Sequence, residues 1–142
     1  MVHALKDIRR VLAADGILID LRPLTDEIPI EVVSAGESHR AGVVEQMPED
    51  RLNDEAANRA TEEAGTKRWF VKEAEKFFIL HYTWTSPKEM QAYAKAEWSN
   101  YISIDEGTWQ DVHSVWSAAV GDAHVRIPFT ILIARWKVSK SE

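Results

Sequence analysis

The opening of the chain constrains its fold most, because it predicts a helix that leads directly into a strand. Apolar residues recur at spacings of three and four from Ala4 to Leu12, which is typical of a helix packed on one face. Gly16 predicts the helix end, since glycine can adopt the left-handed conformation that follows a last turn. The apolar run at residues 17–21 then predicts a strand covered on both sides, as in a parallel sheet.

The rest of the chain predicts further strands and helices, and therefore an α/β fold. Two β-prone runs flank the turn at residues 34–38 and predict a β-hairpin. Ser86, followed by Pro87 and Glu89, predicts a capped helix start, and Asp105 predicts another. Strands are expected at residues 28–33, 42–46, 78–84 and 125–138, and helices at residues 48–64, 67–78, 86–98 and 106–120.

The composition indicates a single globular domain over residues 1–142 and argues against several functions. Apolar residues make up 45% of the chain and charged residues 28%, which is ordinary for a soluble protein. The net charge of −6 argues against nucleic acid as a partner, since phosphate binding needs a concentrated basic surface. No run reaches the roughly 20 apolar residues of a membrane span, and no secretory signal opens the sequence. The chain contains no cysteine, and we expect a cytoplasmic protein without nucleic-acid or membrane partners.

The segment ALKDIRRVLAADGILIDLRP, residues 4–23, resembles the late part of a class I S-adenosylmethionine-dependent methyltransferase. In that family a helix with the pattern RVL-x-x-x-G leads into the fifth strand. The segments TSPKEMQAY and FTILIARW match the family more loosely. The resemblance implies a partial Rossmann-like sheet of late strands, mixed with an antiparallel final strand and covered by helices. It also implies that the final strand, residues 126–137, lies between the strands at 16–21 and 77–84.

The resemblance implies a missing cofactor half as well. In the family, a glycine-rich turn after the first strand and an acidic residue after the second hold the cofactor, and both precede the matching segment. Only Met1, Val2 and His3 precede it here. We therefore expect no cofactor-binding residue in this chain alone, and S-adenosylmethionine only if a complete cofactor half is supplied. The chain resembles a transferase, but whether it is an enzyme by itself stays open.

Asp20 and Arg22 are the first candidate substrate-binding residues. With Pro23, they stand at or just after the carboxyl end of the predicted strand, where open α/β sheets bind ligands. Arg22 can hold a carboxylate through two parallel hydrogen bonds. A surface ion pair or a cap for the loop explains the same residues without a ligand.

His81, Tyr82 and Trp84 form the second candidate group, near the end of the predicted strand at 78–84. A methyl acceptor can stack on Tyr82 or Trp84, and His81 can act as a base near neutral pH. A buried aromatic strand with a hydrogen-bonded histidine is the alternative, which burial statistics favour. The five histidines show no metal-ligand spacing, so no metal site is expected.

Three functional hypotheses follow. The chain supplies the acceptor-binding half of a methyltransferase without being catalytic alone, or Met1 is an internal methionine of a longer enzyme. Alternatively, the chain is a stand-alone small-molecule-binding or oligomerisation module with an aromatic cavity lined by Tyr82, Trp84 and Trp109.

In the parent fold the strand at 16–21 has a neighbour from the missing half. A bare apolar edge recruits another chain, so we expect a homodimer formed through this edge or through the first helix.

Overall fold

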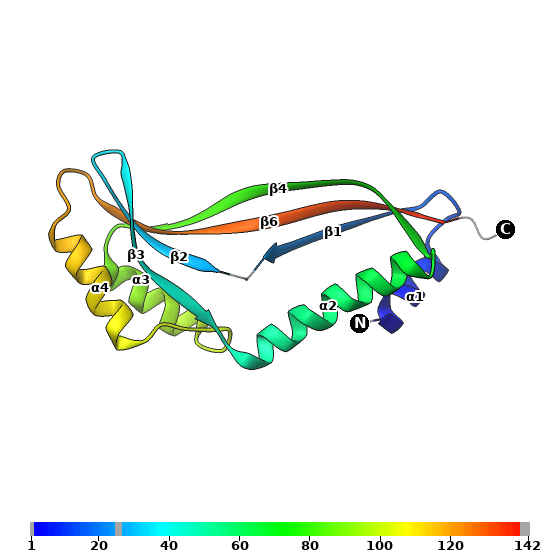
Figure 1. Ribbon diagram of the computed structural model, residues 1–142, viewed down its shortest axis with the longest axis horizontal. Coiled ribbons are helices and arrows are strands. Elements are labelled where there is room, and N and C mark those ends of the chain that lie inside the picture. The colour runs from blue at the N-terminus through cyan, green and yellow to red at the C-terminus, as the bar shows by residue number, and fades with distance from the viewer. Residues whose placement is uncertain (1, 25–26, 140–142) are drawn as a thin grey trace. The chain divides into compact units, whose positions relative to one another are not determined.

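The computed structural model describes residues 2–24 and 27–139 and shows an α/β chain (Figure 1). This part of the chain contains four α-helices and an open, mostly antiparallel sheet of six strands. Met1, whose status as a start or an internal residue the sequence leaves open, lies outside the described residues. The helices are α1 (Val2–Val11), α2 (Pro48–Thr66), α3 (Pro87–Tyr93) and α4 (Glu106–Ser117). The strands are β1 (Ile17–Leu24), β2 (Ile28–Ser34), β3 (Glu37–Gln46), β4 (Phe70–Trp84), β5 (Ile102–Ser103) and β6 (His124–Val138).

The chain divides into two compact units, and β4 and β6 have residues in both. Unit 1 comprises residues 1–24, 49–78 and 131–142, and unit 2 comprises residues 25–48 and 79–130. The strands are hydrogen-bonded in the order β1-β6-β2-β3-β5, and β4 also pairs with β6. The final strand therefore pairs with both β1 and β4, as the sequence predicts (Figure 1).

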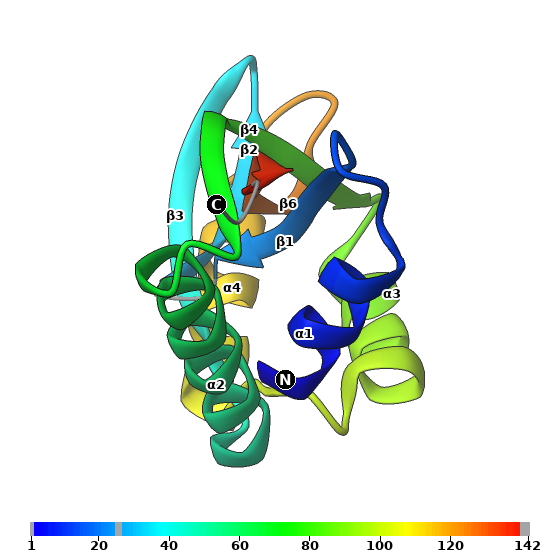
Figure 2. The same ribbon diagram turned by 90° about the vertical axis from the view of Figure 1, so that its right-hand side faces the viewer.

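In unit 1, α1 and α2 pack on the same face of the strands (Figure 2). Leu5 of α1 points into this core, and α2 contributes Ala60 and Ala64, whose small side chains allow close approach. Phe70 of β4 is only 2% exposed and is the largest side chain that is fully buried. Burying such a ring contributes about 1.5–3 kcal/mol, which makes Phe70 the main apolar anchor of unit 1.

The prediction of a helix at residues 67–78 is wrong, because most of this segment belongs to β4. The run Lys-Glu-Ala-Glu-Lys at residues 72–76 has a high intrinsic helix propensity. The strand that contains this run, β4, instead pairs with β6, at residues 124–138. Pairing with a distant strand overrides the helix propensity of this run, which amounts to only about a few tenths of a kcal/mol for each residue.

The prediction that both faces of the first strand are covered is also wrong. In β1 the burial alternates along the strand, and Ile17, Ile19 and Leu21 are 43, 54 and 60% exposed. The other face, which carries Asp20 and Arg22, is half-buried. Because side chains alternate across a strand, covering one face of β1 buries the two charged residues and leaves the apolar ones outside.

Gly16 does not have the left-handed conformation that the sequence predicts, since its φ is not positive. A Cβ atom at this position would lie 2.9 Å from the carbonyl oxygen of Ala13 and 2.9 Å from Cβ of Leu12. The chain therefore needs glycine here because the backbone passes close to the end of α1. The residue type was recognised correctly as a helix terminator, but through the wrong mechanism.

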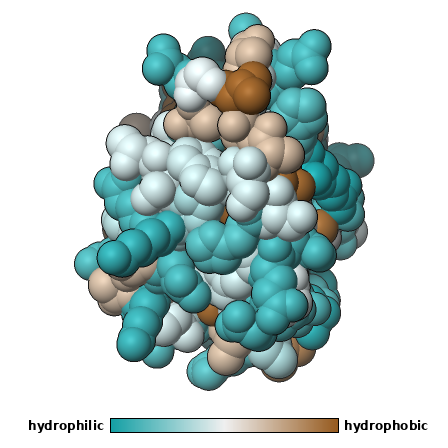
Figure 3. All heavy atoms as spheres, turned by 90° about the vertical axis from the view of Figure 1, so that its left-hand side faces the viewer, coloured by the Kyte–Doolittle hydropathy of each residue, from teal (hydrophilic) through white to brown (hydrophobic). Residues whose placement is uncertain are grey.

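In unit 2, β2 pairs antiparallel with β3 through a two-residue turn at Ala35 and Gly36, both with positive φ. That turn type suits the right-handed twist of the two strands. The end of unit 2 that carries α4 and this turn shows a mostly hydrophilic surface with isolated apolar side chains (Figure 3). The buried core of unit 2 is made by Ile28, Ile30, Val32, Ala41, Val44, Trp84, Met90, Trp109, Val112, Val125 and Ile127.

The two predicted helix caps of unit 2 are confirmed. Oδ1 of Asp105 accepts a hydrogen bond from the Thr108 amide at 2.7 Å, and Oγ of Ser86 accepts one from the Glu89 amide at 3.2 Å. The Glu89 carboxylate does not return to Ser86, however. It accepts from the amide and the hydroxyl of Thr85, both at 2.7 Å, and the side-chain and backbone hydrogen bonds from Thr85 lower the pKa of Glu89.

Candidate functional site

A polar pocket in unit 1 lies between β1, α2, β4 and β6. Asp20 and Arg22 enter it from β1, Asn58 and Thr61 from α2, and Trp136 from β6. The strand alternation puts Asp20 and Arg22 on one face of β1, and the spacing of three puts Asn58 and Thr61 on one face of α2. The cavity has a volume of about 230 Å³. That is small, and it sets an upper limit near the size of an amino acid for a ligand held wholly inside.

Arg22 contacts polar side chains on two sides of this pocket. Its Nη1 donates to Oδ1 of Asn58 at 2.6 Å, and its Nη2 donates to Oγ1 of Thr61 at 3.4 Å. The Thr61 hydroxyl donates its own proton to the backbone carbonyl of Asn58, with Oγ1 2.8 Å from the carbonyl oxygen, and its lone pairs are therefore free to accept the bond from Arg22. Nη2 also lies 3.1 Å from Oδ2 of Asp20, and the two side chains are only 22 and 16% exposed. The guanidinium plane is therefore held by three neighbours from two elements.

Three buried polar atoms of the pocket have no hydrogen-bond partner. They are Oδ2 of Asp20, Nε of Arg22 and Nε1 of Trp136. Oδ2 of Asp20 is close enough to Arg22 for electrostatic attraction, but the pair lacks the geometry of a hydrogen bond. An unsatisfied buried polar group costs about 1–3 kcal/mol. Two donors and one acceptor without partners thus belong to side chains that line one cavity, where a bound molecule or ordered water that reached them would be stabilising.

The wall of the pocket also includes Lys72 and Glu75 of β4, Glu62 of α2, and Leu132 and Ala134 of β6. Nζ of Lys72 donates to Oε2 of Glu75 at 2.7 Å and lies 5.4 Å from the ring centroid of Trp136. A cation over an indole face contributes about 0.5–1 kcal/mol at exposed sites. Lys72 therefore helps to hold the indole of Trp136 in place.

The structure brings together Asp20 and Arg22, as the sequence predicts, but not at the end of a strand. β1 continues through Pro23 to Leu24, so both residues lie inside it. Proline in a strand interior is tolerated where no ladder hydrogen bond is needed from its nitrogen, as on an edge. The predicted strand end was wrong because Arg22 and Pro23 have the composition of a turn.

The other predicted residues lie in unit 2 or at its border. The rings of Tyr82 and Trp84 stack with centroids 6.2 Å apart and planes 19° apart. The Tyr82 ring also meets Trp98 and Phe129 edge-on, at 5.1 and 5.6 Å. Such pairs contribute about 0.5–1.5 kcal/mol each beyond their buried area, so these rings mainly stabilise one another.

His81 and Trp109 do not join that ring cluster. His81 is exposed and alternates to the opposite face of β4 from Tyr82 and Trp84. Trp109 is 6% exposed in the core of unit 2, and it borders a separate depression with Ala94 and Ile102. The aromatic cavity of the alternative hypothesis stays a prediction.

One ion pair gives unit 2 its clearest electrostatic feature. Oε2 of Glu31 in β2 accepts from Nε of Arg126 in β6 at 2.7 Å, with side chains 20 and 26% exposed. Burial alone would raise the pKa of Glu31. Hydrogen bonds from Arg126 and Ser38 outweigh that effect, and the charges of Arg126 and His81 add to it, so the pKa lies below its ordinary value.

Sequence reasoning identified only Asp20 and Arg22 among the polar members of the pocket and missed Asn58, Thr61, Glu62, Lys72, Glu75 and Trp136. Asn58 and Thr61 lie 36 and 39 positions from Arg22, on a helix whose composition looks uniformly polar. The available signal was their spacing of three within α2. For Trp136, nothing local in the sequence shows that its indole N–H lacks a partner.

The turns that lead from strands into helices in the described part lack the glycine-rich sequence of a dinucleotide-binding turn. The turns that lead from β3 to α2, from β4 to α3 and from β5 to α4 contain no glycine. Gly36 follows a strand in a tight turn, but the turn leads into β3 and not into a helix. Within residues 2–24 and 27–139, no group of three His, Asp or Glu side chains could hold a metal ion. No helix of this same part is long and apolar enough to cross a membrane.

Comparison of the chain with protein-family models, with curated proteins and with solved structures gives no match.

Proposed function

We propose that unit 1 binds a small polar molecule in the pocket of Asp20, Arg22 and Trp136, and that the chain thereby supplies the acceptor-binding half of an S-adenosylmethionine-dependent methyltransferase. Three buried polar atoms without a hydrogen-bond partner, on side chains that all line one cavity, carry this proposal. Core-facing polar groups without partners are rare in folded proteins, and three in one pocket indicate a binding site more strongly than any one of them.

The polar atoms define the chemistry of the ligand. Nε of Arg22 and Nε1 of Trp136 both donate, so the ligand presents an oxygen with free lone pairs. Oδ2 of Asp20 accepts, so the ligand also presents an N–H or O–H group. Small amino- or hydroxy-carboxylic acids combine both features within the available volume. Their amino or hydroxyl group is also a nucleophile that can accept a methyl group.

Two observations support the link to methyl transfer. The amino-acid sequence of the opening segment resembles that of the family. In addition, β6 pairs with both β1 and β4, which is the order that the resemblance implies for the late strands. Transfer of a methyl group depends mainly on holding the acceptor in line with the donor. In this proposal the chain orients the acceptor, while the donor is held by residues outside the described part of this chain.

The pocket is tested with the ¹⁵N-labelled chain, by following the indole N–H resonance of Trp136, assigned with Trp136→Phe. We expect glycine, glycolate or a close homologue to shift this resonance saturably. Arg22→Met should abolish the shift, whereas Arg40→Met, which removes an arginine from an exposed ion pair, should retain it. If no acid of this class moves the resonance, the pocket holds only water and the binding proposal fails.

The link to methyl transfer is tested separately, by calorimetric titration of the chain with S-adenosylhomocysteine. We expect no binding tighter than about 1 mM, which corresponds to about −4 kcal/mol. Micromolar binding would show that the chain holds the cofactor itself and would overturn its assignment as an acceptor half.

A further inference from the structure

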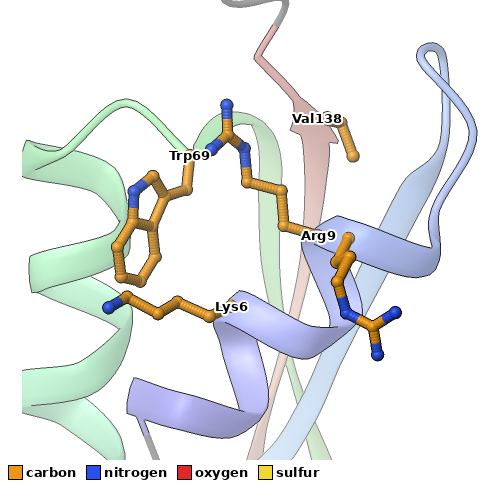
Figure 4. Close-up of a pocket in the computed structure, with 5 residues that line it drawn as sticks. Lys6, Arg9, Trp69 and Val138 are labelled. Carbon is orange, nitrogen blue, oxygen red and sulfur yellow. The ribbon is translucent and has the colours of Figure 1, made fainter.

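A second depression of unit 1 lies on the outer side of α1 and is distinct from the pocket of Arg22. Lys6, Arg9 and Arg10 of α1 line one side of it, and Trp69 and Val138 line the other. Its volume of about 500 Å³ lies within the range of small-molecule sites. Figure 4 shows the Lys6 side chain extending toward the indole of Trp69. Three segments that are distant in sequence therefore meet here.

Trp69 has a well-defined position because it follows a regular helix terminus. The amide of Trp69 donates to the Ala64 carbonyl at 2.9 Å, and the amide of Arg68 donates to the Gly65 carbonyl at 3.0 Å. Arg68 has a φ of 53°, so these bonds form a Schellman motif with arginine in the left-handed position. The carbonyl of Trp69 also accepts from the Ser139 amide at 3.0 Å. The depression is thus built on fixed backbone.

The wall of this depression is positive although the whole chain has a net charge of −6. Three of its five lining residues are cationic, and among the described residues no acidic side chain lines it. Asp7 lies 3.6 Å from Arg10, but both side chains are nearly three-quarters exposed, and such pairs contribute about 0–1 kcal/mol. A ligand anion with better geometry can therefore replace this contact.

Two lysine ammonium groups lie close to the indole of Trp69. Nζ of Lys6 and Nζ of Lys67 lie 5.5 and 5.2 Å from the ring centroid of Trp69. A hydrogen bond from Lys67 lowers the pKa of Glu63, and the charges of Lys67, Lys6 and His3 add to this effect. The positive field of α1 thus extends to the neighbouring end of α2.

We propose that this depression binds the phosphate group of a small ligand, with the cations of α1 holding the phosphate oxygens and Trp69 contacting the apolar remainder. A phosphate monoester carries a charge of about −1.5 to −2 near neutral pH and three acceptor oxygens, which matches a depression lined by three cations better than a single carboxylate does. The planar guanidinium group of arginine can also donate two parallel hydrogen bonds to two oxygens of a phosphate. The site is independent of the pocket of Arg22. The phosphate belongs either to a soluble metabolite or to a lipid headgroup.

The test compares ligands that differ only in phosphate, again with the ¹⁵N-labelled chain and the indole resonance of Trp69. We expect adenosine monophosphate to shift this resonance saturably and adenosine to leave it in place. Sedimentation with phosphatidylcholine vesicles, with and without phosphatidylglycerol, examines the lipid source in parallel. Binding to the anionic vesicles alone would assign the phosphate to a lipid, and binding to the nucleotide would assign it to a soluble ligand.

Two paired variants separate the site from overall charge. Lys6→Gln combined with Arg10→Gln should weaken binding at least about tenfold, since each removes one charge-assisted contact. Arg51→Gln combined with Lys88→Gln removes the same charge from exposed positions outside the depression and should leave the affinity unchanged. Equal losses in both pairs, equal binding of adenosine, or no binding to either phosphate source would overturn the proposal.

Discussion

Replacing Arg22 by methionine should destabilise the chain far more than the same replacement of Arg40. Both arginines donate a hydrogen bond of 2.6 Å and both have a carboxylate partner. They differ in burial: the side chains of Arg22 and Asp20 are 22 and 16% exposed, whereas those of Arg40 and Glu27 are 54 and 63% exposed. Arg22 donates its short hydrogen bond to the Asn58 amide and Arg40 to the Glu27 carboxylate, so the comparison sets a half-buried arginine beside an exposed one.

The expected magnitudes follow from what each change leaves behind. Arg22→Met removes a charge-assisted hydrogen bond to Asn58, worth about 1.5–3 kcal/mol, and leaves the Asp20 carboxylate half-buried without its cation. Removing one partner of a fully buried pair costs about 3–5 kcal/mol. Because this pair keeps some contact with solvent, we expect a loss of about 2–3 kcal/mol in the free energy of unfolding. Arg40→Met should cost about 0–1 kcal/mol.

Urea denaturation followed by circular dichroism measures both losses. A double-mutant cycle with Asp20→Asn should give a coupling energy of about 1–2 kcal/mol between Asp20 and Arg22, since the neutral amide tolerates the loss of the arginine better. If Arg22→Met costs no more than Arg40→Met, or if the coupling is zero, Arg22 does not organise the pocket. The assignment of its Nε to a ligand would then lose its structural basis.

Two further predictions concern unit 2 and the exposed face of β1. The stability that Glu31 contributes beside Arg126 is present above its ordinary pKa of 4.5 and is lost as the pH falls through the lower pKa of the folded chain. The gap in unfolding free energy between the wild-type chain and Glu31→Gln should therefore shrink below pH 4.5, and a gap that does not vary with pH would contradict this. Leu21, which is 60% exposed, belongs to the strand on which we expect two copies to associate. Leu21→Lys should lower the molar mass measured by light scattering at micromolar concentration, and a monodisperse wild-type monomer would refute the homodimer.

Local signals in the sequence were reliable where the physics is local. The caps at Ser86 and Asp105 need only a side-chain oxygen and an amide three residues later, so the sequence predicts both correctly. The long final strand was also recognisable, because apolar residues stand at every second position from Val125 to Ile133. In contrast, the segment at residues 67–78 has helical composition and forms part of β4, since its hydrogen-bond partner is β6.

The sequence by itself determined that this is an α/β chain and that Asp20 and Arg22 lie on one face of a strand, because side chains alternate along a strand. Only the tertiary structure decided which face of β1 is covered, and therefore that these two charged residues are half-buried while Ile19 and its apolar neighbours are exposed. It also decided which partners Arg22 finds on α2 and that the N–H of Trp136 lacks one. Those outcomes depend on contacts between segments 36 or more residues apart, and no local pattern in a sequence specifies how such segments pack against each other.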